Sequence, residues 1–209
     1  MHKGFVYAFI RLGHNQGMSV RAPRPARLSK EEWLELEKQT GLRYEYLDGF
    51  VYAMVGESQE HNDIVGNIND ALRAKAKAKG CRYAFHNVRT WVKVLNRYYY
   101  PDVVVSCAEE SDPYEIHQAC FILEVFSPST ADKDRREKLE AYFKIPTLNT
   151  YVLVSQEEKR VEIYQKTRWN LVWSELVNSG EVEIPCLETT LSLEQIYAGT
   201  PVPEVPEEG

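Results

Sequence analysis

The chain has 209 residues, of which 44% are hydrophobic and 27% are charged, and its formal net charge is −6. This length and composition indicate one globular domain with a hydrophobic core, and no apolar run approaches the length of a membrane span. The negative charge argues against a broad, sequence-blind coat on nucleic acid, which depends on neutralised phosphates, but it leaves room for a local basic groove or a metal site. We therefore expect a soluble, cytoplasmic protein without a membrane segment.

The two ends of the chain differ in composition from the part between them. Residues 1–27 mix Gly, Arg and Pro, which predicts an extended or disordered arm, and either Met1 or Met18 can be the first residue. Residues 28–198 carry the helix and strand patterns of the predicted domain. Residues 199–209 are acidic and rich in proline, so we expect a disordered tail.

The first part of this domain predicts two helices separated by a hairpin. The helix over residues 29–41 opens with a Ser followed three residues later by a Glu, which is a capping box. The dipeptide Asp48-Gly49 then predicts a tight turn between two strands. A long helix follows over residues 58–80, and His61 lies on the same face as its apolar residues.

The rest of the domain is rich in strand patterns. Runs of β-branched and aromatic residues predict strands over residues 82–86, 90–95, 97–106, 119–125, 150–155, 160–166 and 169–176. One further helix is expected over residues 129–144. The order of these elements predicts a mixed α/β or α+β fold, with one mixed central β-sheet flanked by helices.

Four cysteines are spread over the chain, and none of them forms a C-x-x-C motif. They are Cys81, Cys107, Cys120 and Cys186. Three of them sit in apolar, strand-like runs, which favours buried free thiols over a disulfide framework or a zinc site.

Two acidic residues interrupt the most apolar strands. Glu124 lies within the run CFILEVF, and Asp102 follows Pro101 within the run YYYPDVVVS. A lone buried carboxylate costs roughly several kcal/mol unless a positive charge meets it. Either acid alone fits a structural role, Asp102 as a turn residue and Glu124 as the partner of a structural Lys or Arg. As a pair on consecutive strands they also fit a Mg²⁺ site, because a divalent ion offsets their repulsion.

The helix expected over residues 129–144 offers positive charge to that pair. At a period of about 3.6 residues per turn, Lys138 falls at the edge of its apolar face and Arg135 near the middle. Lys133 points away from this face. One alternative is an ordinary amphipathic helix whose long side chains reach out to solvent.

These segments together resemble a known family. The motifs YEYLDGFVYAMVG, YYYPDVVVS, FILEVFSPST and DRREKLEAYFK, with the strands that follow, are similar to the Uma family of predicted restriction endonucleases, part of the PD-(D/E)XK nuclease superfamily. The resemblance covers about residues 28–198. It implies a restriction-endonuclease-like fold whose metal-binding acids lie on adjacent strands.

The resemblance also implies roles for single residues. Asp102 and Glu124 match the two metal-binding acids, and Glu45 matches an upstream Glu that helps to hold metal or water. The superfamily's usual Lys lies two residues beyond the second acid, where this chain has Phe126. In this family the matching residue is Lys138, on the following helix.

The expected chemistry is hydrolysis of DNA phosphodiester bonds with Mg²⁺ or Mn²⁺, held by Asp102, Glu124 and the backbone carbonyl of Val125. Lys138 would orient the attacking water and stabilise negative charge. His61, Arg135 and Arg89 are candidates for contact with phosphate. For His61 the alternative is a half-buried imidazole bonded to a carboxylate, and for Glu45 it is a cross-strand ion pair.

Two other functions stay open from the sequence. One is an inactive interaction domain on a nuclease fold, and the other is a metal-dependent phosphoesterase that acts on small substrates. Aromatic-rich strands suggest exposed apolar surface, so we expect a homodimer, which also suits an enzyme that cuts both DNA strands.

Overall fold

A mixed six-stranded sheet forms the centre of the computed structural model, which describes residues 27–54 and 56–206. Its strands, in spatial order, are β11 (Leu171–Val177), β10 (Arg160–Lys166), β9 (Thr150–Ser155), β8 (Phe121–Phe126), β6 (Val103–Ser106) and β3 (Arg82–Phe85). Only β8 and β9 run parallel, and the other neighbours pair antiparallel. The predicted mixed sheet is confirmed.

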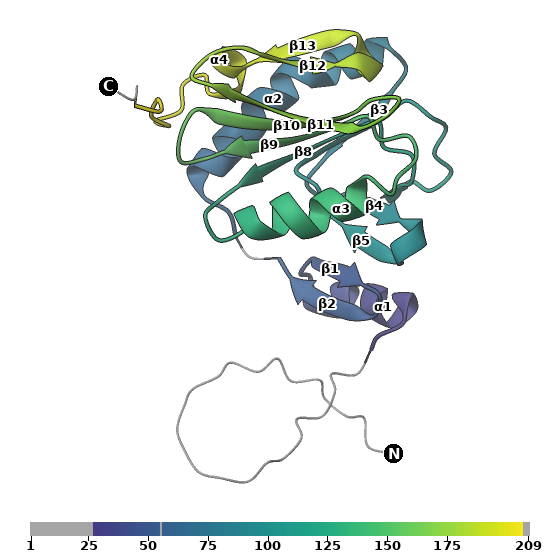
Figure 1. Ribbon diagram of the computed structural model, residues 1–209. Helices are drawn as coiled ribbons and strands as arrows, with labels where there is room; N and C mark the ends of the chain where they lie inside the picture. Colours follow the sequence, from purple (N-terminus) through teal and green to yellow (C-terminus); the bar gives the residue numbers. More distant parts are fainter. Residues whose placement is uncertain (1–26, 55, 207–209) are drawn as a thin grey trace, which may run out of the picture.

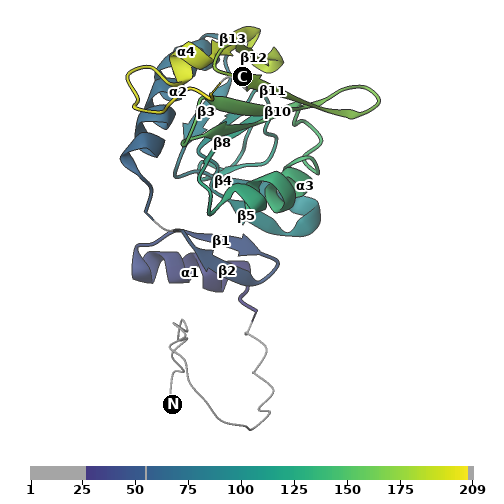
Figure 2. The same cartoon turned by 60° about the vertical axis from the view of Figure 1, so that its left-hand side comes forward.

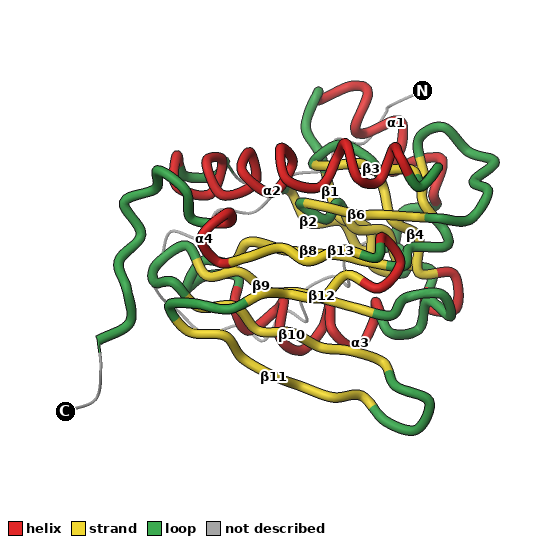
Figure 3. The backbone as a smooth tube through the Cα atoms, turned by 90° about the horizontal axis from the view of Figure 1, so that it is seen from above, coloured by secondary structure: helices red, strands yellow, loops and turns green. Residues whose placement is uncertain are grey.

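Helices cover both faces of this sheet (Figure 3). Helix α2 (Gln59–Ala78) packs its apolar stripe on one face, together with Val103 and Val105. The other face is covered by a π-helix (Lys133–Lys138) that continues into α3 (Leu139–Tyr142). Val104 of β6 packs on this second face. Successive strand residues point to opposite faces, so strands buried on both sides are apolar throughout.

A second sheet carries the N-terminal part of the domain, at the lower end in Figure 1. It has the order β2 (Phe50–Ala53), β1 (Tyr44–Leu47), β5 (Arg97–Tyr99), β4 (Arg89–Val92) and β7 (Glu115–Ile116). Helix α1 (Lys30–Thr40) has the predicted capping box and buries Trp33 against Tyr46 and Tyr98. Asp48 and Gly49 both have positive φ, as a tight hairpin turn requires, so this predicted hairpin is confirmed.

The C-terminal elements lie at the opposite end of the molecule, beside α2 (Figure 2). They are β12 (Glu181–Ile184), the 3₁₀-helix η3 (Pro185–Leu187), β13 (Thr189–Ser192) and α4 (Leu193–Ile196). A short 3₁₀-helix, η1 (Lys93–Leu95), joins β4 to β5. The part of the chain that the structure describes thus forms three sheets, where the sequence patterns predicted a single central one.

Part of the acidic tail packs on the domain. Val202 is buried, and the backbone N–H of Lys159 donates to the carbonyl of Pro203. Asn178 exchanges two hydrogen bonds with the backbone of Val205. The expectation of disorder is therefore wrong for residues 202–205, because an apolar side chain and free backbone groups there find partners. The predicted N-terminal arm lies outside the described residues, apart from Arg27.

The expectation of free thiols is also wrong, since Cys81 is bonded to Cys107 and Cys120 to Cys186. These pairs are 26 and 66 residues apart in the chain, so their spacing gave no sign of the bonds. Within residues 27–54 and 56–206, no helix is both long and apolar enough to cross a bilayer.

Candidate functional site

Two buried carboxylates face each other where β6 and β8 pair. Val103 lies opposite Leu123, and the same register continued by one residue puts Asp102 opposite Glu124. Asp102 is 5% exposed and Glu124 is 3% exposed. The backbone N–H of Val125 donates a hydrogen bond of 2.7 Å to Oδ2 of Asp102. The register thus brings together the two acids that interrupt the apolar strands.

A cavity of about 420 Å³ opens beside this pair. Six of the residues singled out from the sequence line it, namely Glu45, His61, Asp102, Glu124, Val125 and Lys138. They come from β1, the first turn of α2, the strand pair β6–β8 and the π-helix. Residues that are far apart in the sequence therefore line the same cavity.

Lys138 is the cation at the centre of this cluster. Its Nζ lies 3.0 Å from Oε1 of Glu124, 3.0 Å from Oδ1 of Asp134 and 3.6 Å from Oε1 of Glu45. The hydroxyl of Tyr142 donates a hydrogen bond of 2.7 Å to the same Oε1 of Glu124. Glu124 is thus fixed by one ammonium and one phenol, both from the helical segment that follows β8.

The π-helix decides which side chains of that segment enter the site. The backbone N–H of Leu139 donates to the carbonyl of Asp134, five residues earlier, so each turn holds more residues than in an α-helix. Arg135 consequently leaves the cavity and pairs with Glu162, with 2.6 Å between Nη2 and Oε1. Lys133, which a regular helix would turn away, lines the cavity and contacts Glu45.

The buried charges perturb one another strongly. Burial raises the pKa of Glu124 to about 8, opposed by the ammonium of Lys138 and aided by the charges of Asp102 and Asp134. Burial disfavours the charge on Lys138, but Glu124, Glu45 and Asp134 outweigh it and hold the lysine pKa well above its usual value. The cluster has more carboxylates than ammonium groups, and a divalent cation would offset the excess.

His61 lies between two carboxylates at the start of α2. Its Nε2 is 3.1 Å from Oδ2 of Asp102, and its Nδ1 is 2.9 Å from Oε2 of Glu57. Burial opposes a charged ring, but these two carboxylates raise the pKa of the imidazole to about 10. His61 is therefore a buried imidazole held between the carboxylates of Asp102 and Glu57.

Arg89 lies elsewhere. Its guanidinium is 3.6 Å from Glu37 and 3.5 Å from Glu115, and it covers the ring of Trp33. Neither Arg89 nor Arg135 lines the cavity. Both neutralise buried carboxylates of the scaffold instead.

Sequence reasoning missed several members of the site. Asp134 and Tyr142 belonged to the analysed helix, but a charge near a helix start and an aromatic on an apolar face have ordinary explanations. Glu57 and His86 gave no signal, yet Glu57, His86 and Asp102 each bring a ligand-type atom within 4.8 Å of the others. His86 has positive φ, which is uncommon for such a residue and marks a constrained turn at the end of β3.

The donors present fit a hard divalent cation. Carboxylate and backbone carbonyl oxygens are the ligands of Mg²⁺, and Asp102, Glu124, Glu45 and Val125 are among the residues that line the cavity. Buried carboxylates that repel one another are also stabilised by such an ion. The residues present therefore fit a divalent cation that prefers oxygen ligands.

Comparison with known proteins identifies a family and a shared fold. The family model described as "Uma2: Putative restriction endonuclease" matches residues 30–195. The chain belongs to the Uma2 family. Its resemblance to that family, drawn above from the motifs, is thereby confirmed.

Two proteins similar to this chain come from Synechocystis sp. (strain ATCC 27184 / PCC 6803 / Kazusa), and both are described as uncharacterized proteins. One is 29% identical over 186 residues, covering 87% of this chain and 96% of the relative. The other is 30% identical over 143 residues, covering 66% of this chain and 81% of the relative.

A solved structure shares the fold. It is a crystal structure described as a "putative nuclease belonging to DUF820" from Anabaena variabilis, with a TM-score of 0.64 and 16% identity, covering 80% of this chain and 96% of that one. The fold of this Uma2 chain is therefore that of a restriction-endonuclease-like nuclease.

Proposed function

We propose that the chain is a metal-dependent DNA endonuclease that hydrolyses phosphodiester bonds. The observation that supports this most is the convergence of Asp102, Glu124, Glu45 and Lys138 on one cavity. Paired acids with a lysine are a suitable set for phosphoryl transfer to water, and the family description points to nucleic acid as substrate.

Asp102, Glu124 and the carbonyl of Val125 would hold Mg²⁺ or Mn²⁺, and Glu45 would bind it through water or hold a second ion. When bound, the ion supplies a Lewis acid and lowers the pKa of a coordinated water. Each acid is already oriented by a neighbour, Asp102 by the Val125 N–H and His61, and Glu124 by Tyr142. Such oriented carboxylates lose little freedom on binding the ion.

The lysine and the histidine would serve the reacting groups in different ways. Lys138 would stabilise negative charge on the phosphoryl oxygens and orient the attacking water. His61 would fix the position of Asp102, because its ring already touches Oδ2 of that carboxylate. Lys133, which lines the cavity and is 35% exposed, would contact a DNA phosphate.

The proposal includes a homodimer in the cytoplasm. β11 is an edge strand of the six-stranded sheet, and four of its residues are exposed apolar ones, Leu171, Val172, Trp173 and Val177. An exposed, apolar edge strand favours pairing with a second chain. A two-fold dimer would present two sites to the two DNA strands. Analytical sedimentation checks the homodimer: wild type should be dimeric and Trp173→Glu should be monomeric. A wild type that stays monomeric would contradict the homodimer.

Nicking of supercoiled plasmid with Mg²⁺ or Mn²⁺ tests the function. Wild type should nick, Glu124→Gln should lose more than about 100-fold in rate, and EDTA should stop the reaction. Glu162→Gln is the matched control, because it also removes a buried carboxylate charge but lies outside the cavity. It should nick like wild type.

Each other result has a meaning. A folded wild type that neither nicks DNA nor binds Mn²⁺ favours the inactive interaction domain. Hydrolysis of a small chromogenic phosphoester without action on DNA favours the phosphoesterase. Equal nicking by Glu124→Gln and wild type would contradict the assignment of this site.

A further inference from the structure

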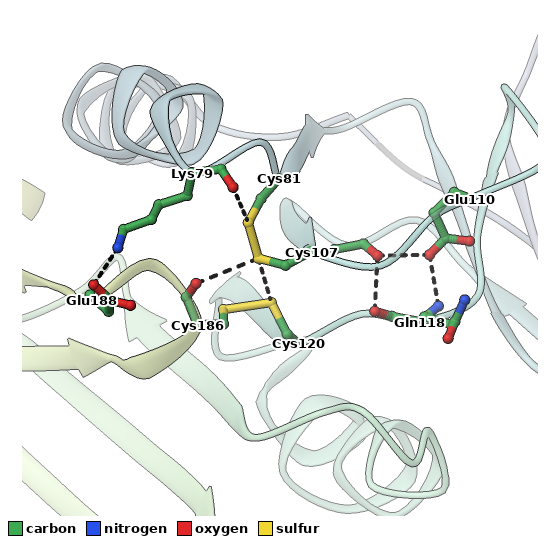
Figure 4. The surroundings of a disulfide bond; sticks show 9 residues. Lys79, Cys81, Cys107, Glu110, Gln118, Cys120, Cys186 and Glu188 are labelled. Carbon is green, nitrogen blue, oxygen red and sulfur yellow. Dashed lines mark hydrogen bonds and ion pairs between the residues drawn. A yellow bond between two sulfur atoms is a disulfide. The ribbon is translucent and has the colours of Figure 1, made fainter.

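Four cysteines meet in one place (Figure 4). This place lies at the end of the β6–β8 strand pair opposite to the acids. These four are all the cysteines of the chain, and each comes from a different segment. Cys81 precedes β3, Cys107 follows β6, Cys120 precedes β8 and Cys186 lies in η3. The proposed nuclease chemistry uses none of them.

Strand pairing accounts for this meeting. In the antiparallel pair β3–β6, Arg82 lies opposite Ser106, and one further residue puts Cys81 opposite Cys107. On the other side of β6 the backbone N–H of Cys120 donates to the carbonyl of Val105, which aligns Cys120 with the same strand end. Three neighbouring strands thus deliver three thiols to one place, and η3 brings the fourth.

One sulfur of the first disulfide, Sγ of Cys107, touches the second disulfide, and Cys81 joins the cluster through its bond to Cys107. Sγ of Cys107 is 3.7 Å from Sγ of Cys120, and the sulfurs of Cys107, Cys120 and Cys186 all lie within 4.8 Å of each other. In a tetrahedral zinc–thiolate site with Zn–S bonds of about 2.3 Å, neighbouring sulfurs are about 3.8 Å apart. Two independent disulfides do not require their sulfur atoms to lie this close together. Four thiolates that bind the same metal ion do.

We propose that the reduced form of this cluster binds one Zn²⁺ through Cys81, Cys107, Cys120 and Cys186. Thiolates are soft ligands, and a tetrahedral set of four selects zinc over Mg²⁺ or Mn²⁺. Cys107 is exposed and Cys81 and Cys186 are half-buried, so the ion has a path from solvent. The site would tie the end of α2 and the β12–β13 unit to the central sheet.

The chemistry balances with a dithiol as reductant. Each disulfide accepts two electrons and two protons from one dithiol, which becomes a disulfide in turn. The four thiols then lose four protons as one Zn²⁺ binds their thiolates. The cytoplasm keeps thiols reduced, so the zinc form belongs to the location proposed above, while the disulfide form belongs to oxidising conditions.

Zinc counting on the full chain tests the proposal. The protein is reduced with a phosphine under argon, freed of reductant, loaded with Zn²⁺ in excess Mg²⁺ and freed of unbound metal. Reduced wild type should retain one zinc ion per chain, and oxidised wild type none. Cys107→Ser and Cys186→Ser should lose this zinc, whereas Glu124→Gln should keep it, because the acid cavity is a separate site.

Cobalt(II) gives a second readout that needs no variant. Reduced wild type with Co²⁺ should show the sulfur-to-cobalt charge-transfer and d–d bands of a tetrahedral thiolate site, and these decide the matter if the Ser variants fail to fold. Three outcomes overturn the proposal: reduced wild type without zinc or cobalt bands, zinc retained after Cys107→Ser, or zinc lost in Glu124→Gln. The colour of an iron–sulfur cluster in protein purified without oxygen would also overturn the choice of zinc. Plasmid nicking is measured separately, so failure of one proposal leaves the other standing.

Discussion

The two ends of the β6–β8 strand pair hold opposite kinds of donor. Asp102 precedes β6 and Glu124 lies near the end of β8, whereas Cys107 follows β6 and Cys120 precedes β8. Because the strands run antiparallel, the start of one lies beside the end of the other. Each end therefore gathers residues from two distant parts of the chain. Oxygen donors suit hard cations, and sulfur donors suit soft ones.

The two ends also differ in what stabilises them. The acid end is buried, and its carboxylates depend on Lys138, Tyr142 and His61 for compensation. The sulfur end lies near the surface and is held by covalent bonds. A perturbation of one end should therefore leave the chemistry of the other unchanged, and the predictions below test that separation.

The largest expected effect is reduction of the two disulfides without added metal. Each bond closes a long loop and should contribute about 2–4 kcal/mol, so the loss of both should lower the free energy of unfolding by about 4–8 kcal/mol. Added Zn²⁺ should restore much of this. Urea denaturation followed by circular dichroism measures the change, with Glu124→Gln as the control that should lose the same amount. Equal stability before and after reduction would show that the bonds contribute nothing.

Next in size is Lys138→Ala at the acid end. This change leaves Glu124, Glu45 and Asp134 without their shared ammonium, and removing one partner of a buried ion pair costs about 3–5 kcal/mol. Lys144→Ala, at an exposed position after the same helix, should stay within about 0.5 kcal/mol of wild type. A small loss in Lys138→Ala would mean that the carboxylates are neutral or solvated. Zinc binding by the reduced cysteines should persist in the folded fraction.

The acid end was largely predictable because local signals marked its members. An acid within an apolar strand is costly, so Asp102 and Glu124 stand out without any structure. Helical spacing pointed to Lys138, and the Asp48-Gly49 turn fixed the hairpin that carries Glu45. These signals lie within a few residues of the side chains they concern, whereas Glu45 itself was singled out by the resemblance to the family.

The rest depended on properties that spacing does not show. The π-helix changed the facing of Lys133 and Arg135, and no residue pattern marks the extra residue in its turn. The cysteine cluster depends on the registers of β3, β6 and β8 and on where η3 docks. Pairing across 26 and 66 residues is a property of the whole fold.

An intermediate effect is expected for Tyr142→Phe. Loss of the hydroxyl leaves Oε1 of buried Glu124 with one donor fewer, which should cost about 1–3 kcal/mol of stability and also slow nicking. Tyr197→Phe is the matched control, because its buried hydroxyl donates to the carbonyl of Ser155, away from the acids. It should lose comparable stability and keep its nicking rate per folded molecule. Equal nicking by the two variants would remove Tyr142 from the site.

The smallest effect is expected for Arg135→Gln. A comparison with Lys133→Gln tests which residues of the π-helix belong to the acid site. Arg135 is 39% exposed and pairs with Glu162 outside the cavity, so its loss should cost about 1 kcal/mol or less. Tyr164 still donates to Glu162 in that variant. Lys133→Gln removes the charge that contacts Glu45 and should slow nicking by about tenfold. Plasmid nicking of both variants at equal folded concentration makes the comparison. If this segment were a regular α-helix in solution, Arg135→Gln would slow nicking more than Lys133→Gln, since Arg135 would then face Glu124 and Lys133 would face solvent.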